Sequence, residues 1–216
     1  KNGVVMPLPP TVSAQEQPVL SLLEGADGTL WCGMREGLMG LHTDGRITYH
    51  VAGPNGPGRS VRSLWQDSYG HLWMATDNGL VRMNGARFDR WTTAQGLSDN
   101  TVQCLLADPK GRLWIGTANG LSCMDGGVFR TIRLGNDFGS NHLSLLLSDG
   151  EGRIWAGTNN GLYAFQPDSL LRDPSHAEHI NLNDGLRSLE FNLNAAIVDA
   201  GRLFFGSSAG MVYHDL

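Results

Sequence analysis

Charged residues are scarce in this sequence of 216 residues, at 17%, and none of them forms a basic run. The net charge is −5, and Lys and Arg are scattered singly. Because binding to a nucleic-acid backbone needs clustered positive charge, we expect no nucleic-acid partner. No apolar stretch approaches the roughly 18 residues of a membrane span, and no long run rich in Ala, Glu, Lys and Leu indicates a helix.

Cysteine is also rare, and Cys32, Cys104 and Cys123 leave one unpaired at best. Their spacings of 72 and 19 residues match no zinc pattern. Cys32 lies beside a tryptophan in an apolar run and Cys104 lies within VQCLL, so we expect both to be small buried core residues. No HExxH, P-loop or paired-carboxylate motif occurs, and we therefore expect neither a metal nor a cofactor.

Two further patterns resemble catalytic or metal-binding motifs. GSSAG at 206–210 matches the G-x-S-x-G pattern of serine hydrolases, which needs a strand, a sharp elbow and then a helix. Here it occupies the turn between two predicted strands, so we expect no catalysis. Among seven histidines only His176 and His179 are close in sequence, inside a polar segment. A solvated loop is the expected role of this pair, and a weak metal site is the alternative.

Glycine, by contrast, is plentiful at 29 residues, and much of it belongs to a repeat. In each copy an aromatic residue is followed two positions later by a small residue and, four after that, by glycine. The copies lie 42, 41, 41 and 49 residues apart, which indicates a repeat unit of about 41 residues. They are GTLWCGMREGL (28–38), GHLWMATDNGL (70–80), GRLWIGTANGL (111–121), GRIWAGTNNGL (152–162) and GRLFFGSSAGM (201–211).

The third copy gives the clearest prediction of strands. Asn119-Gly120 is a strong two-residue hairpin signal, because both central positions of such a turn need positive φ. Other turns are predicted at Pro-Lys-Gly before this strand pair and at Gly-Gly after it. Four antiparallel strands in each unit are typical of a β-propeller blade. The predicted strands of this unit cover 101–108, 112–117, 121–125 and 128–132.

We therefore predict an all-β fold, a β-propeller of four-stranded antiparallel blades with five repeats, in a single domain over 1–216. Residues 1–10 resemble an outer fourth strand and the chain stops after a third strand, so the first strand could complete the last blade and close a five-bladed ring. Closure would remove sheet edges that invite aggregation. The alternative is that these are the C-terminal five blades of a larger ring. The repeat cores are predicted at 19–50, 61–91, 102–132, 143–165 and 193–216, with an insertion at 166–185.

The repeated aromatic residue is predicted to pack between blades. Blades pack face to face around an axis, and a large ring at a fixed strand position would fill the wedge between neighbours. The small residue two positions along lies on the same strand face and leaves room for a neighbouring backbone. An aromatic cage for a ligand is the alternative. The predicted blade-packing residues are Trp31, Trp73, Trp114, Trp155 and Phe204.

The segment QGLSDNTVQCLLADPKGRLWIGTANGL (95–121) combines G-L-S-x-N-x-V with D-x-x-G-x-L-W-x-G-T-x-x-G-L. It resembles the two-component regulator propeller repeat. NDGLRSLEFNLNAAIVDAGRLFFGSSAG (183–210) is similar to the closing repeat of that family, in which an E-F-N segment precedes F-F-G. The resemblance implies a periplasmic sensor ectodomain of a bacterial membrane protein, normally built as a seven-bladed ring. Family members usually continue with an immunoglobulin-like domain, a membrane span and a histidine kinase or diguanylate cyclase output.

A binding site is best sought on one face of the predicted ring. Turns between second and third strands lie on the same face as the links between blades, and loops on a rigid scaffold carry function. These positions vary between units while the strands do not. The alternative is turn chemistry alone, which favours Asn and Asp for backbone reasons. The candidate ligand-binding residues are Arg35, Glu36, Asp77, Asn78, Asp99, Asn100, Asn119, His142, Asn159, Asn160, Glu190 and Asn192.

Three functions are compatible with this sequence. The first is a noncatalytic sensor propeller that binds a small molecule, by family analogy a saccharide, or a partner domain of the same polypeptide. The second is an enzyme, because the first two units loosely resemble the streptogramin lyase repeat, which needs a general base and a divalent metal at the ring axis. The third is a structural or protein-docking propeller, whose exposed edges could pair between copies as a homodimer.

Overall fold

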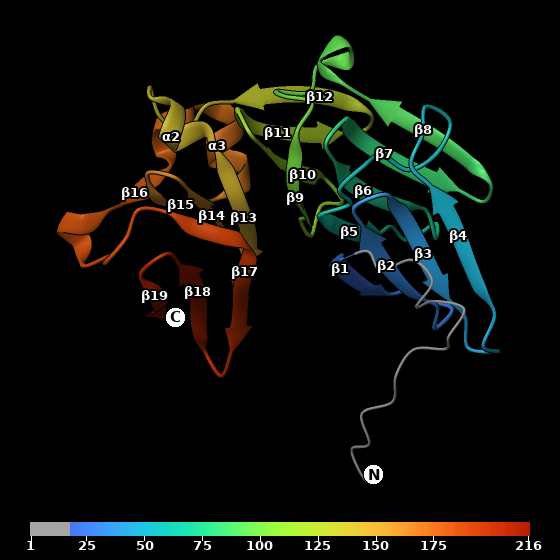
Figure 1. The fold of residues 1–216 in the computed structure, drawn as a ribbon. Helices are drawn as coiled ribbons and strands as arrows, with labels where there is room; N and C mark the ends of the chain where they lie inside the picture. Colours follow the sequence, from blue (N-terminus) through green and yellow to red (C-terminus); the bar gives the residue numbers. More distant parts are fainter. Residues whose placement is uncertain (1–17) are drawn as a thin grey trace, which may run out of the picture.

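The computed structural model describes residues 18–216, which form five antiparallel β-sheets (Figure 1). The sheets follow one another in chain order around a common centre, which is the arrangement of a five-bladed β-propeller. Four sheets have four strands, and the fifth has three among the described residues. The predicted all-β propeller fold is confirmed. The outer strand predicted at 1–10 lies outside the described residues.

Each blade is a meander in which consecutive strands are hydrogen-bonded neighbours. Blade 1 contains β1 (Val19–Glu24), β2 (Leu30–Met34), β3 (Gly37–Leu41) and β4 (Ile47–Val51). Blade 2 contains β5 (Ser63–Gln66), β6 (Leu72–Thr76), β7 (Gly79–Asn84) and β8 (Arg87–Trp91). Blade 3 contains β9 (Val102–Ala107), β10 (Leu113–Thr117), β11 (Gly120–Asp125) and β12 (Val128–Ile132). Blade 4 contains β13 (Leu143–Ser148), β14 (Ile154–Thr158), β15 (Gly161–Phe165) and β16 (Glu178–Ile180), and blade 5 contains β17 (Phe191–Asp199), β18 (Arg202–Ser207) and β19 (Gly210–Asp215).

Helical structure is confined to short segments in the connections. They are the 3-10 helices η1 (Thr93–Gln95), η2 (Pro174–His176) and η3 (Leu182–Asp184) and the α-helices α2 (Phe138–Asn141) and α3 (Pro167–Arg172). Over residues 18–216, no helix is both long and apolar enough to cross a lipid bilayer. The first strands of consecutive blades contact one another, which places them innermost in the ring.

A threonine side chain closes the hairpin that joins the second and third strands of a blade. In blade 3 the Thr117 hydroxyl donates to the carbonyl of Gly120 at 2.7 Å and accepts the N–H of Asn119 at 3.2 Å. Only Gly120 of the Asn-Gly pair has positive φ, at 125°. The prediction of two positive-φ central residues was therefore wrong, because Thr117 pairs directly with Gly120 and the turn is formed by Ala118 and Asn119.

The apolar core is divided into clusters that lie between consecutive blades. Along a second strand, the indole faces the next blade while its two neighbours face the previous blade, as the alternation of a strand requires. The clusters combine Trp31 with Leu72 and Met74, Trp73 with Leu113 and Ile115, Trp114 with Ile154 and Phe165, and Trp155 with Leu203 and Phe205. Each of these four indoles thus lies between two sheets.

An aspartate six residues earlier holds three of these indoles. The indole N–H of Trp114 donates to Asp108 at 3.0 Å, and the same carboxylate accepts the backbone N–H of Arg112 across the turn. The corresponding bonds from Trp73 to Asp67 and from Trp155 to Asp149 are 2.9 and 3.0 Å. This pairing explains why D-x-x-G precedes L-W in the repeat, because one carboxylate fixes both the turn and the indole.

The small residue two positions after the aromatic ring lies against the next blade. A Cβ built on Gly33 would lie 2.5 Å from the carbonyl oxygen of Val61, and one on Gly157 would lie 3.0 Å from the Cβ of Phe191. Both partners belong to the beginning of the following blade. Glycine is therefore needed at these two positions because both the first strand of the same blade and the beginning of the next blade approach too closely to admit a methyl group.

Phe204 differs from the four tryptophans with which it aligns. It is half-buried and lies beside Tyr213, with ring centroids 6.2 Å apart, on the face of blade 5 that points away from blade 4. That face also carries Ile197 and Met211, which are 60% and 70% exposed. No further sheet of the described chain packs on this face. Phe204 therefore does not lie between two described sheets, whereas the sequence predicted that it would.

The segment predicted as an insertion at 166–185 contains part of blade 4. Residues 178–180 form β16, which pairs with β15 and supplies the fourth strand. The sequence alone did not reveal this strand because it is only three residues long and is preceded by polar residues and Pro174. The inserted part precedes β16, and its helix α3 packs the fully buried Leu170 into the cluster of Trp114.

The inserted helix is also held by charge. Asp168 accepts from Lys110 at 2.6 Å and from Arg112 at 2.7 Å, and both donors belong to blade 3. The bonds from Lys110 and Arg112 lower the pKa of Asp168 to about 2. Because a carboxyl group in an unfolded chain titrates near pH 3.9, this carboxylate stabilises the fold fully above about pH 5 and ceases to do so as the pH falls through 2.

Asp168→Asn is expected to flatten the dependence of stability on pH in the acid range. The free energy of unfolding of the wild type should fall more steeply than that of the variant between about pH 5 and pH 2, as measured by urea denaturation. Because Asp168 is about half exposed, 1 M NaCl should reduce the difference through screening. Parallel profiles for the two proteins at low salt would contradict a stabilising role of this carboxylate.

Candidate functional site

Turns and blade links meet on one face of the propeller, as predicted from the strand order. The N–H of Ser60, in the link from blade 1 to blade 2, donates to the carbonyl of Arg35 at 2.7 Å. The N–H of Asp77 donates back to the carbonyl of Arg59 in the same link at 3.0 Å. In the next link, Gly79 donates to the carbonyl of Asn100 at 2.6 Å. Each of these links is therefore fixed to the turn of a neighbouring blade.

Most of the candidate ligand-binding residues take part in turn hydrogen bonds around this face. Their partners are within one blade or one link, so these side chains are spread around the ring and are not gathered at a single point. Asp99 accepts from Thr101, Asn100 accepts from Thr93, Asn119 accepts from Arg133, Asn160 donates to Asp137 and Asn192 donates to the carbonyl of Ser207. His142 is half-buried in the link into blade 4, Asn159 is exposed in the blade 4 turn, and Glu190 is exposed beside β17.

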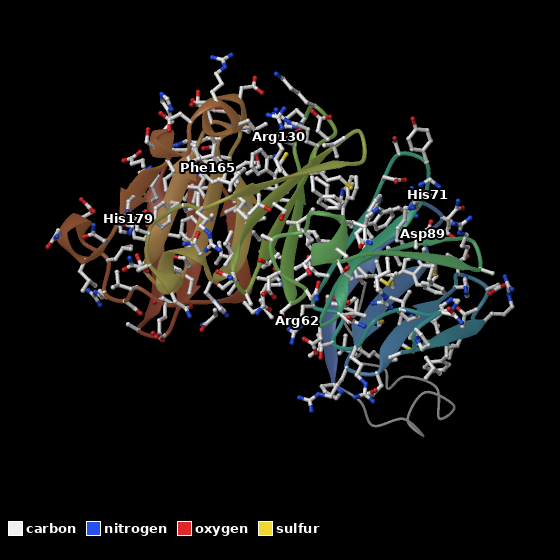
Figure 2. The ribbon with its side chains drawn as sticks, turned by 90° about the horizontal axis from the view of Figure 1, so that it is seen from above. Arg62, His71, Asp89, Arg130, Phe165 and His179 are labelled. Carbon is white, nitrogen blue, oxygen red and sulfur yellow. The ribbon has the colours of Figure 1, made fainter. Side chains whose placement is uncertain are left out.

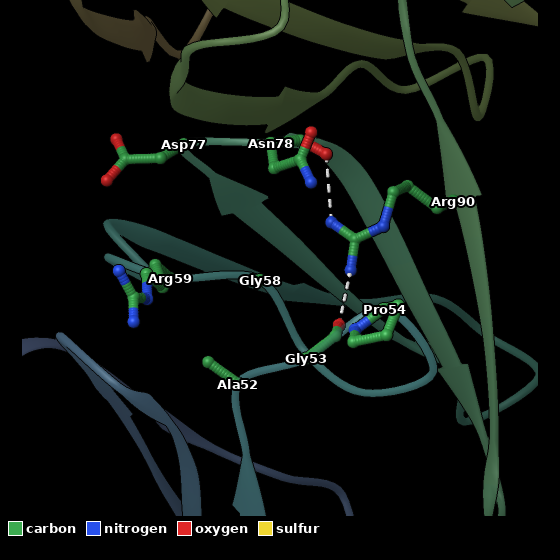
Figure 3. A pocket seen from close by; sticks show the side chains of 8 residues that line it. All are labelled: Ala52, Gly53, Pro54, Gly58, Arg59, Asp77, Asn78 and Arg90. Atoms are coloured by element: carbon green, nitrogen blue, oxygen red, sulfur yellow. Dashed lines mark hydrogen bonds between the residues drawn. The ribbon is translucent and has the colours of Figure 1, made fainter.

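The link between blades 1 and 2 forms the exception, because it encloses a cavity of about 380 Å³ (Figure 3). Two of the candidate residues, Asp77 and Asn78, lie on its wall. Arg35 and Glu36 lie in the adjoining turn of blade 1, where the carboxylate of Glu36 pairs with Arg59 at 3.0 Å. The lining residues are Ala52, Gly53, Pro54, Gly58, Arg59, Asp77, Asn78 and Arg90.

The wall of this cavity is a glycine- and proline-rich loop, AGPNGPG (52–58), pressed against β6. A Cβ built on Gly58 would overlap the side chain of Thr76. The N–H of Gly53 donates to the carbonyl of Pro57 at 3.2 Å, and the N–H of Gly56 donates to the carbonyl of Gly53 at 3.3 Å. The loop is thus fixed by its own hydrogen bonds and packs closely against β6. It forms one wall of the cavity.

Arg90, on the outer strand β8, fixes the loop from the other side. Its guanidinium donates to the carbonyls of Asn78, Gly53 and Gly56 at 2.8, 3.2 and 3.0 Å. Figure 3 shows the side chain crossing from β8 toward Asn78 and Gly53, opposite Asp77 and Arg59. Burial lowers the pKa of Arg90 from its ordinary value, although a guanidinium remains charged in proteins.

The sequence did not point to Arg59 and Arg90, which contribute the positive charge of this site. One available signal was the link 52–58, the most glycine- and proline-rich connection between blades, which departs from the polar links at other blade boundaries. No such signal marks Arg90, because an arginine on an outer strand is explained equally well by exposure to solvent. Its role depends on how β8 folds back over a link more than 30 residues earlier in the chain.

A second cavity, of about 280 Å³, lies where the inner strands of blades 1, 2, 4 and 5 come together. Asn194 of β17 lines it and has φ of 51°, in the left-handed region that asparagine tolerates better than most residues. Its amide donates to the carbonyl of Arg62 at 2.8 Å and to that of Gln103 at 3.4 Å. Blade 5 is thereby tied across the centre of the ring to blades 2 and 3.

The histidines do not form a common site. The Nδ1–H of His71 donates to the carboxylate of Asp67 in its own turn at 3.0 Å, and His176 lies 3.9 Å from Asp173 of its own loop. His71 and His179 lie at opposite sides of the molecule in Figure 2. Among the residues that the structure describes, no group of three or more His, Cys, Asp or Glu side chains is arranged to hold a metal ion.

The repeat itself matches a known family. Residues 96–119, which run from the link before blade 3 through β10 to its turn, match the model described as two component regulator propeller. The chain carries the two-component regulator propeller repeat. In this structure the matched residues include Asp108, Trp114 and Thr117, which form the aspartate–indole bond and the threonine-closed turn described above. A search of curated proteins finds no match.

Several solved structures have a fold similar to that of this chain. The extracellular domain of the hybrid two component system BT3049 from B. thetaiotaomicron superposes with a TM-score of 0.80 at 20% identity, over 94% of this chain and 28% of that one. Virginiamycin B lyase from Staphylococcus aureus gives 0.69 at 14% identity, over 94% and 72%. A chain of a nidogen–laminin complex gives 0.63 at 12% identity, over 93% and 76%. The chain spans less than a third of the length of the first, and these likenesses show the fold alone.

Proposed function

We propose that this chain is a noncatalytic sensor propeller on the outer side of a bacterial membrane, within a signal-transduction protein. It would bind a small polar solute, such as a saccharide, in the cavity between blades 1 and 2. The two-component regulator propeller repeat and the likeness to an extracellular domain of a hybrid two component system support the sensor role. The same comparison supports a periplasmic location, which is part of the proposal.

The cavity between blades 1 and 2 is the observation that supports this binding site. Asp77 and Asn78 on its wall offer acceptors and donors for hydroxyl groups, and Arg59 and Arg90 offer further donors. Cavities that bind small ligands carry a few convergent polar groups of this kind on a preformed framework. The bonds that hold the loop 52–58 preform this framework before any ligand arrives.

A nuclear magnetic resonance titration of the 216-residue chain with neutral and acidic mono- and disaccharides tests this proposal. At least one solute is expected to shift the amide signals of Gly53, Arg59 and Asn78 in a saturable way. Asn78→Ala is expected to weaken its binding at least about tenfold, which corresponds to roughly 1.4 kcal/mol. Asn159→Ala, an exposed asparagine in the matching turn of blade 4, should leave the affinity unchanged. Saturable shifts confined to the opposite face, around the turn of Lys110, would contradict the site.

An enzyme of the streptogramin lyase type is the second candidate function. It is favoured by the fold likeness to virginiamycin B lyase, with a TM-score of 0.69. Liquid chromatography of virginiamycin B incubated with the chain and Mg²⁺ would detect its conversion, and an unchanged chromatogram would count against this activity. A protein-docking role, in which another domain or a second copy binds the apolar face of blade 5, is the third candidate function.

A further inference from the structure

Of the two arginines that line the cavity, Arg59 has a carboxylate partner and Arg90 has none among the described residues. Its neighbours are paired: Arg59 with Glu36, Arg62 with Asp77, and both Arg82 and Arg87 with Asp89. In the described part of the chain, no carboxylate oxygen lies within 4.0 Å of the Arg90 guanidinium. Within residues 18–216, the cavity therefore has a fixed positive charge without a paired carboxylate.

The residues around Arg90 fix the position of its positive charge. Three backbone carbonyls hold the guanidinium, and they belong to the loop 52–58 and to the β6–β7 turn. A guanidinium has five N–H donors, so three hydrogen bonds leave two donors for a ligand. Carbonyl dipoles orient the group but do not neutralise it, and a partly buried unpaired cation is costly unless an anion joins it.

We infer that the cavity takes a solute carrying an oxyanion, a carboxylate or a sulfate, and that Arg90 binds this group. This inference rests on the proposed binding site and specifies its ligand class. Charge-assisted hydrogen bonds from arginine to carboxylate or sulfate are stronger than bonds between neutral groups, so the anion would determine the affinity. Asn78, on the same wall, would then bind a neutral part of the solute, such as a hydroxyl group.

The chain supplies a matched pair of variants for the test. Arg90→Gln and Arg87→Gln each remove one positive charge from β8, but Arg87 is exposed and pairs with Asp89 outside the cavity. Glucuronate, glucose and inorganic sulfate serve as probes in calorimetric and nuclear magnetic resonance titrations at low salt. Glucuronate and glucose have the same ring and differ mainly in the carboxylate, while sulfate shows whether the anion alone is sufficient.

The wild type is expected to bind glucuronate at least tenfold more tightly than glucose. Arg90→Gln should lose this preference, and Arg87→Gln should keep it within about twofold. Arg90→Lys, which keeps the charge but cannot bridge three carbonyls, should retain part of the preference. If sulfate competes with glucuronate, the oxyanion is recognised by its charge; if it does not, the carboxylate is recognised together with the sugar ring.

Equal binding of glucose and glucuronate, with no effect of Arg90→Gln, would overturn the oxyanion inference while leaving the proposed site intact. Absence of any saturable response of the wild type to both glucuronate and sulfate would also overturn it. Shifts of neutral saccharides at Gly53 and Asn78 would in that case still support the proposed function, and their absence as well would remove both. Circular dichroism and thermal unfolding of each variant separate loss of binding from loss of fold, and Arg90→Lys serves if Arg90→Gln does not fold.

Discussion

Trp114→Ala is expected to lower the free energy of unfolding by about 3–5 kcal/mol, the range typical of a large aromatic side chain removed from a core. Trp114 is fully buried between blades 3 and 4, and its indole N–H donates to the buried carboxylate of Asp108. The substitution would leave a cavity in the cluster and remove a hydrogen bond at the same time. Urea denaturation followed by circular dichroism measures the difference.

Two further variants divide this loss into its parts. Trp114→Phe keeps a smaller aromatic ring but removes the N–H, so it should cost about 1–3 kcal/mol, because one hydrogen bond to the charged Asp108 carboxylate is lost. Tyr69→Ala removes an aromatic ring that is 84% exposed and should change stability by less than about 0.5 kcal/mol. If Trp114→Ala proved as mild as Tyr69→Ala, packing of indoles between blades would not be what stabilises this fold.

Gly79→Ala is expected to destabilise the protein by about 2 kcal/mol more than Gly210→Ala. Both glycines begin the third strand of a blade and have positive φ, at 102° and 109°, so both substitutions incur the same backbone strain of about 1–2 kcal/mol. A Cβ on Gly79 would also overlap the carbonyl oxygen of Trp91 on the neighbouring strand, whereas one on Gly210 meets no atom of residues 18–216 within 4 Å. Overpacking of this kind costs about 1–3 kcal/mol in addition.

Thermal and urea unfolding of the two glycine variants give the comparison directly. Because the backbone conformation is the same at both positions, the difference isolates the effect of the fourth strand lying alongside. Equal destabilisation by the two variants would contradict this prediction. It would mean that β8 moves away from the new methyl group at no cost in stability.

The fold could be predicted from the sequence because every blade repeats the same order of apolar strands and glycine-containing turns. The predicted strands of blade 3 agree with β9 to β12 within one residue at each end, since apolar runs and glycine turns mark them. The repeat also located the four indoles that lie between sheets. It did not reveal the bond from Asp108 to Trp114, because an aspartate before a turn is explained equally well by the turn itself.

The candidate site could be predicted only in part. Asp77 and Asn78 were predicted as variable turn residues on one face of the ring, and the structure places them on a cavity wall. Arg90 could not be recognised, because its contacts with Gly53 and Gly56 depend on the distance between a strand and a link far away in sequence. Asn119 and Asn160, which have the same sequence signature as Asn78, are occupied by local hydrogen bonds instead.

Within residues 18–216, blade 5 has three strands and packs against one neighbouring blade, and this affects how the described part of the chain unfolds. In repeat proteins each unit is stabilised by its own contacts and by those with adjacent units, so a unit with fewer neighbours unfolds first. Asn194 partly offsets this by tying blade 5 to the carbonyls of Arg62 and Gln103. Thermal fraying that begins at the C-terminal unit would therefore release a constraint on the backbone next to Arg62, whose side chain pairs with Asp77 at the ligand cavity.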